Sequence, residues 1–250
     1  MRNTRLSGTV MTTSVSIPVN PIAASIPSEN VVRDIGNVPR MCMCRIRGWN
    51  VFLPLFTFAV SFAQMACYYA LPSDSLEFKI PLPPSEVWRI SSYMFAHKNS
   101  YHLYANVVST LLLTTYLEFY SGFLRIGVLW FACGVFSGLV QSQFMYESDQ
   151  AKSLIGSSGA VFGIVSAYIA HVIMNWSELQ LPVLYAAIAL FTIGLEVTTA
   201  TVSPVNNVAY VAHLSGAVYG LILGLVLIRN LRWKTYEKYI FYIASVAALT

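Results

Sequence analysis

The chain has 250 residues, of which 56% are hydrophobic and only 10% carry a charge. Soluble domains contain about 25% charged residues, so this composition argues against a water-soluble globule of this length. The 15 Lys and Arg residues outnumber the 11 Asp and Glu residues, but their placement follows the apolar runs and forms no patch for nucleic acid. We therefore expect an all-α membrane protein with several spanning helices.

Residues 1–48 precede the first apolar run and are rich in Ser, Thr, Asn and Pro. They show no apolar periodicity, and such a segment buries too little apolar surface to offset the cost of ordering the chain. The sequence therefore predicts a disordered tail.

Six apolar runs follow, each close to the length of about 20 residues that a helix needs to cross a bilayer. They lie approximately at 49–71, 102–120, 123–140, 159–176, 181–197 and 208–228. The range 49–228 is therefore predicted to form a six-helix membrane domain. Residues 229–250 are interpreted as a basic linker and the start of a seventh hydrophobic segment, which begins at Tyr239. From there to Thr250 is too short to cross a bilayer, so this segment is either cut short or lies shallowly in the membrane.

The basic residues predict the orientation, because cytoplasmic loops of membrane proteins are enriched in Lys and Arg. Most of the 15 fall on one side of the membrane if the N-terminal tail is cytoplasmic. The second, fourth and sixth runs then travel from the outer face inward. The connection 72–101 lies on the outer side, where Trp88 and Arg89 suit the interface; an ordinary solvated loop is the alternative.

Polar groups inside apolar runs are costly, so their positions are informative. The second run opens with His102 and Asn106, which share one helix face, and His97 lies just upstream. The fourth run opens at Ser158, and the sixth carries His213 near its start. All of these residues fall at the outer ends of the three inward-running helices. A serine needs a base to become a nucleophile, and histidine is the usual one, so Ser158 and His213 are candidate catalytic residues.

Glycines near both residues favour close helix packing. Gly159 with Gly163, and Gly216 with Gly220, are spaced as pairs that let membrane helices approach each other. This packing would bring the sixth helix against the fourth and deliver His213 to Ser158. By contrast, His171 lies about 20 Å along the fourth helix from Ser158 and is interpreted as a packing residue.

The remaining polar residues limit the chemistry. Asn106, His102 and the backbone N–H of Ser158 are candidate donors to an oxyanion. No aspartate lies within the apolar runs, which excludes an intramembrane aspartyl pair, and no zinc-binding His-Glu-x-x-His motif is present. No acidic residue lies near His213 in its run, so a Ser–His dyad is expected rather than a triad, with no metal and no cofactor.

These motifs resemble those of the rhomboid family of intramembrane serine proteases, over roughly residues 49–238. The family's GxSG motif is matched at 156–159, its AHxxGxxxG motif at 212–220, and its HxxxxHxxxN motif at 97–106. A Trp-Arg pair in the first loop is matched by Trp88 and Arg89. The surrounding residues and the seventh segment are most similar to the animal secretase-type branch, which has six core helices plus one.

The resemblance implies Ser158 as nucleophile, His213 as base, and supporting roles for the other matched residues. These are His97, Phe162, Gly156, Gly159, Gly216, Gly220, Trp88 and Arg89. One departure is Phe162, where family members usually have a tyrosine whose ring supports the catalytic imidazole. The aromatic face is retained and a hydroxyl is lost, which concerns efficiency more than chemistry. Inactive relatives often place proline before the serine, but here that residue is Ser157.

The resemblance therefore implies a multi-pass protease of the Golgi, another endomembrane or the plasma membrane, with its N-terminus in the cytoplasm. Its expected partners are the lipid bilayer and single-pass membrane proteins, which it would cleave near the lumenal or extracellular face. The sequence does not define its oligomeric state. Two alternatives stay open: an inactive pseudoprotease that binds transmembrane helices, and a proton-coupled transporter using the histidines. The transporter would require midplane polar residues and paired interrupted helices, and neither is evident.

Overall fold

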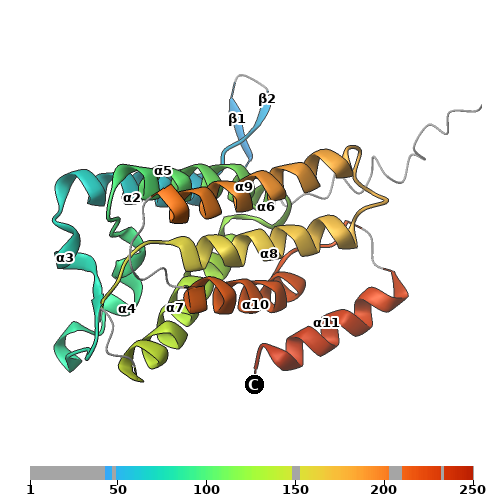
Figure 1. The fold of residues 1–250 in the computed structure, drawn as a ribbon. Coiled ribbons are helices and arrows are strands. Elements are labelled where there is room, and N and C mark those ends of the chain that lie inside the picture. The colour runs from blue at the N-terminus through green and yellow to red at the C-terminus, as the bar shows by residue number, and fades with distance from the viewer. Residues whose placement is uncertain (1–42, 47–48, 148–152, 203–209, 232–233, 250) are drawn as a thin grey trace, which may run out of the picture. The chain divides into compact units, whose positions relative to one another are not determined.

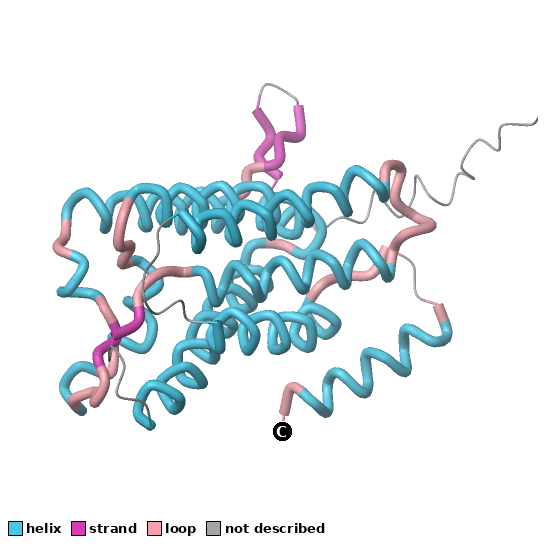
Figure 2. The backbone as a smooth tube through the Cα atoms, in the orientation of Figure 1, coloured by secondary structure: helices cyan, strands magenta, loops and turns pink. Residues whose placement is uncertain are grey.

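The computed structural model describes residues 43–46, 49–147, 153–202, 210–231 and 234–249, all within one compact unit, Asn37–Thr250. Most of the predicted tail therefore lies outside the described residues. The described chain is largely helical, with short strands in two places (Figure 2). This agrees with the predicted all-α membrane fold.

The first apolar run does not begin as a helix. Strands β1 (Met43–Ile46) and β2 (Trp49–Phe52) form an antiparallel hairpin in which Met43 pairs with Phe52. Helix α2 (Leu55–Ala70) starts only after Pro54, whose ring disfavours a helical conformation in the residue before it. The predicted helix start at residue 49 is wrong because apolar composition alone does not separate a strand from a short stretch of helix.

The connection after α2 is folded. It contains α3 (Ser73–Leu76), β3 (Phe78–Lys79), η2 (Pro84–Glu86), α4 (Arg89–Ser92) and η3 (Tyr93–Phe95). Strand β3 pairs with β4 (Ser153–Leu154), which lies just before the Ser158 motif. This pairing ties the connection to the loop that carries the candidate nucleophile.

The second apolar run forms a helical segment with an irregular centre. It consists of α5 (Ser100–Ser109), the π-helical turn η4 (Thr110–Thr114) and α6 (Thr115–Ser121). Asn99 caps α5 by accepting a hydrogen bond from the backbone N–H of His102 at 2.9 Å. Gly122, with a φ of +86°, ends the segment in a conformation that other residues rarely adopt.

The remaining helices are α7 (Phe123–Glu147), α8 (Ser158–Met174), α9 (Pro182–Val202), α10 (Tyr210–Leu227) and α11 (Thr235–Ala247). Helix α8 packs against α7, α9 and α10, and α10 also contacts α11 (Figure 1). The seventh segment thus begins as a helix four residues before Tyr239. Because α8 is buried on several sides, the residues at its ends lie among other helices.

Helix lengths fit a membrane-embedded chain. The spans Phe123–Tyr146 and Tyr210–Leu227 are long and apolar enough to cross a bilayer. Leu55–Ala70, Ser158–Met174 and Pro182–Thr198 are apolar but shorter. Apart from the strand at the start of the first run, the predicted runs correspond to helical segments, and α7 extends beyond its predicted end at residue 140.

A buried carboxylate joins α2 and α6. Glu118 of α6 is fully buried, and its oxygens accept hydrogen bonds from the backbone N–H groups of Phe56 and Thr57, both at 3.0 Å. The Thr57 hydroxyl donates a third at 2.8 Å. These N–H groups belong to the first turn of α2, where the helix itself supplies no acceptor and where a negative charge is favourable. Glu118 therefore caps α2 from a neighbouring helix.

Replacing Glu118 with Gln should destabilise the protein by about 1–3 kcal/mol, because the cap loses its charge and buried N–H groups lose an acceptor. Thermal unfolding of the purified protein in detergent measures the change. Glu77→Gln is the control, since Glu77 makes only a partly exposed ion pair with Lys79 at 3.2 Å. Equal unfolding midpoints for the two variants would contradict the capping role.

Candidate active site

The loop before α8 has a conformation that requires glycine. Gly156 has a φ of +104°, and a Cβ atom at this position would lie 2.4 Å from Cε1 of His102. The backbone N–H of Gly156 donates to the carbonyl of Tyr93 at 3.0 Å. The loop is therefore held against the connection 72–101, and it delivers Ser158 as the first residue of α8.

The structure brings Ser158 and His213 into contact. Oγ of Ser158 lies 2.8 Å from Nε2 of His213, which comes from the first turn of α10. The ring of Phe162, one turn after Ser158, stacks on the His213 imidazole with centroids 4.5 Å apart and planes 19° apart. The imidazole is thus held between a hydroxyl at its edge and an aromatic face.

Glycines set the distance between the two helices. A Cβ atom at Gly216 would lie 2.2 Å from the carbonyl oxygen of Gly159, and one at Gly220 would lie 2.3 Å from that of Gly163. No side chain fits between the helices at these levels, so α8 and α10 touch backbone to backbone. This contact lies directly below the Ser158–His213 pair.

Two glutamines that sequence reasoning missed also hold the site. Gln64 of α2 accepts a hydrogen bond from the hydroxyl of Ser157 at 2.8 Å. Gln141 of α7 accepts one from the backbone N–H of Ala212, the residue before His213, at 3.0 Å. Gln64 is a fully buried amide within an apolar run and Gln141 a partly buried one beside another. The cost of taking such a group out of water is the signal that could have identified them.

His97, His102 and Asn106 lie together next to this loop. The rings of His97 and His102 meet edge to face with centroids 5.2 Å apart. Nδ2 of Asn106 donates to the carbonyl of His102 at 2.8 Å, and its Oδ1 is buried without a hydrogen-bond partner in the described part of the chain. His102 reaches the Ser158 loop through its close approach to Gly156.

Trp88 and Arg89 have a different place from the other matched residues. Arg89 is buried and donates to three backbone carbonyls, those of Asp74, Ser75 and Glu77, and to the carboxylate of Glu86 at 2.6 Å. Its guanidinium carbon lies 4.6 Å from the centroid of the half-exposed Trp88 ring. These contacts lie within the connection after α2, so the pair stabilises that connection.

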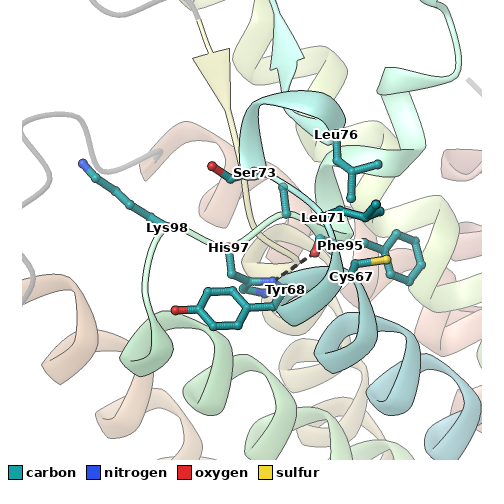
Figure 3. A pocket seen from close by; sticks show the side chains of 9 residues that line it. Cys67, Tyr68, Leu71, Ser73, Leu76, Phe95, His97 and Lys98 are labelled. Carbon is teal, nitrogen blue, oxygen red and sulfur yellow. Dashed lines mark hydrogen bonds between the residues drawn. The ribbon is translucent and has the colours of Figure 1, made fainter.

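A cavity of about 250 Å³ lies beside His97, at the end of α2 (Figure 3). Its lining includes Cys67, Tyr68, Leu71 and Phe95, while Lys98 points away from the other labelled side chains. Neither Ser158 nor His213 lines it. The Ser–His pair and this cavity are therefore separate features of the structure.

The other predicted packing residue, His171, lies at the far end of α8. It is buried beside the rings of Tyr116 and Tyr120, with centroids 5.6 and 5.3 Å away. Asn175 donates to its backbone carbonyl at 2.8 Å. Within the described ranges, no group of three or more His, Cys, Asp or Glu side chains is arranged to hold a metal ion.

The fold and the site define a membrane-embedded helical protein with a serine and a histidine paired across two glycine-packed helices. A family model described as "Rhomboid domain" matches residues 84–230, which is more than half of the chain. The chain belongs to the rhomboid family.

Individual relatives agree with this assignment. Rhomboid-related protein 3 of Homo sapiens is 34% identical over 169 residues, which cover 64% of this chain and 41% of that protein. Rhomboid-related protein 1 of Caenorhabditis elegans is 32% identical, with coverage of 63% and 45%. RHOMBOID-like protein 1 of Arabidopsis thaliana is 29% identical, with coverage of 82% and 51%. The chain thus spans about half the length of these relatives.

Gly216→Ala should push α8 and α10 apart and destabilise the protein by about 1–3 kcal/mol, because the new methyl group meets the Gly159 backbone. Gly194→Ala is the matched control, since a Cβ atom there meets nothing within 4 Å and alanine is the better helix former. Thermal unfolding should show a lower midpoint for the first variant and an equal or higher one for the second. Two equal midpoints would mean that the glycine contact does not limit the helix spacing.

Proposed function

We propose that this rhomboid-family protein is an intramembrane serine endopeptidase that cleaves single-pass membrane proteins near the lumenal or extracellular membrane face. The observation that carries the proposal is the 2.8 Å contact between Oγ of Ser158 and Nε2 of His213. A hydroxyl within hydrogen-bond reach of an imidazole is the arrangement that nucleophilic catalysis by serine requires.

In this mechanism, Ser158 attacks the substrate carbonyl while Nε2 of His213 accepts the hydroxyl proton. His213 then returns that proton to the leaving amine, which releases one fragment and leaves an acyl group on Ser158. Water, activated by the same imidazole, attacks the acyl group and frees the second fragment. The proton therefore moves between two groups that already touch, and no metal or cofactor is needed.

The oxyanion of the tetrahedral intermediate requires donors at the same place. The backbone N–H of Ser158 belongs to the first turn of α8 and has no acceptor within its own helix. Asn106 uses one Nδ2 hydrogen for the His102 carbonyl, which leaves the second for an oxyanion. We assign His102 as a further donor because its ring lies against Gly156, two residues from Ser158. Preorganised donors of this kind are usually the largest catalytic contribution.

The proposal extends to the protein's surroundings. The N-terminus is placed in the cytoplasm, so that Ser158 faces the lumenal or extracellular side of the Golgi, another endomembrane or the plasma membrane. The distribution of Lys and Arg supports this orientation. Substrates would reach the site from the surrounding bilayer as single transmembrane helices.

Ser158→Ala and His213→Ala should each lower cleavage of membrane-anchored reporter substrates by at least about 10³-fold, because the dyad acts as a unit. Co-expression with a panel of such substrates and immunoblotting of the released fragments measures this. Ser215→Ala is the control, since the Ser215 hydroxyl donates to the Val211 carbonyl of its own helix at 2.7 Å. A wild-type protein that binds reporters but cleaves none, and that a fluorophosphonate does not label, would indicate a pseudoprotease instead.

Phe162→Leu should lower kcat by roughly 2- to 10-fold, because aromatic stacking contributes about 0.5–1.5 kcal/mol beyond area burial. Steady-state cleavage of one reporter by the purified protein gives kcat and KM separately. Phe162→Tyr keeps the ring and should retain at least wild-type kcat. If Leu and Phe were equivalent at this position, the ring would not orient the imidazole.

A further inference from the structure

Polar side chains line the contact between α2 and the segment formed by α5, η4 and α6. Successive members are three or four residues apart on α2 and four apart on the facing segment, so each set lies on one helix face. We call six of them the polar seam: Thr57, Ser61, Gln64, Thr110, Thr114 and Glu118. Each is at most 5% exposed. The packing of α2 against η4 and α5 places the two sets in one interface.

Contacts at the two ends fix how the helices face each other. Thr57 bonds to Glu118 at one end, and the hydroxyls of Tyr69 and Tyr104 lie 2.6 Å apart at the other. The two segments are thus antiparallel. Residue numbers rise along α2 in the direction in which they fall along the facing segment of α5, η4 and α6. Four residues from the Thr57–Glu118 contact, Ser61 falls opposite Thr114. One turn further, Gln64 falls opposite Thr110.

Four polar side-chain atoms in the middle of the polar seam are without hydrogen-bond partners in the described part of the chain. Oγ of Ser61, Nε2 of Gln64 and Oγ1 of both Thr110 and Thr114 are buried, and none has a hydrogen-bond partner among the residues that the structure describes. A serine or threonine in a helix commonly bonds to the carbonyl one turn earlier. Ser61, Thr110 and Thr114 do not make this bond.

We propose that the polar seam binds a row of buried water molecules, one bridging Ser61 to Thr114 and another bridging Gln64 to Thr110. A buried hydroxyl or amide without a partner destabilises the folded state, and the antiparallel register sets these four groups opposite each other in two pairs. Water suits them because it both donates and accepts, and buried waters typically bond to about three otherwise unsatisfied polar groups. An apolar molecule would leave all four groups without partners.

The row of waters ends next to the candidate active site. Oε1 of Gln64 accepts a hydrogen bond from the Ser157 hydroxyl. Nε2 of the same amide is a donor and requires an acceptor. A water between Gln64 and Thr110 supplies that acceptor and fixes which end of the amide faces Ser157. The seam therefore connects the Glu118 cap of α2 to the residue before Ser158. This inference does not depend on whether Ser158 is catalytic.

Ser61→Ala and Thr114→Val test the proposal through the sign of their effect on stability. If water bridges the two hydroxyls, either change removes a bond and leaves the opposite group poorly paired, so each should lower the Tm by about 2–4 °C or more in detergent. If the seam is dry, removing an unpartnered hydroxyl should leave the Tm unchanged or raise it. Thr192→Val is the control, since Thr192 is buried but donates to the Ala189 carbonyl at 2.8 Å.

The double variant and a crystal structure of the full chain complete the test. With a shared water, Ser61→Ala combined with Thr114→Val should lower the Tm little more than the larger single change, because both bonding groups are then gone. Electron density for water at both positions in a high-resolution map supports the proposal. A direct Ser61–Thr114 hydrogen bond, or a seam without water density, overturns it whatever the Tm values.

Discussion

The backbone contact between α8 and α10 is the constraint on which the rest of the site depends. A methyl group at Gly216 or Gly220 would lie within 2.3 Å of the α8 backbone, so only glycine permits this spacing. Ser158 begins one helix and His213 lies in the first turn of the other, directly above the contact. A side chain reaches only a few ångströms, and the 2.8 Å separation of Oγ and Nε2 follows from the approach of the backbones.

Polar groups inside an apolar protein hold the other elements in place. Glu118 caps α2, and Arg89 donates hydrogen bonds to backbone carbonyls of the connection after α2. Gln141 accepts a hydrogen bond from the N-terminal turn of α10. Each bonds to backbone groups, and Glu118 and Arg89 also bond to the side chains of Thr57 and Glu86. Where water is excluded, such hydrogen bonds do not compete with bonds to water. They therefore fix the ends of helices more firmly than surface contacts would. The polar seam extends the same arrangement between α2 and η4.

Much of the fold followed from hydropathy, and its errors have physical causes. The apolar runs correspond to helices because a continuous apolar stretch in lipid must satisfy its own backbone groups. The β1–β2 hairpin was missed because an apolar strand and an apolar helix start look alike without their neighbours. Gln64 was missed because its partner, Ser157, lies far away in sequence. The rhomboid assignment rests on the family model that matches residues 84–230, the range that holds the motifs read from the sequence.

The sequence by itself indicated the candidate reactive residues: a serine in the motif at 156–159 and histidines at matching depths, in runs expected to be helical because they are apolar. It also determined that α8 and α10 could approach, since glycine spacing is a local property. Only the tertiary structure decided that Ser158 and His213 touch, that Phe162 lies flat on the imidazole, and that Arg89 serves the connection after α2. These contacts join residues on different elements, and their geometry depends on how the helices pack rather than on any local pattern.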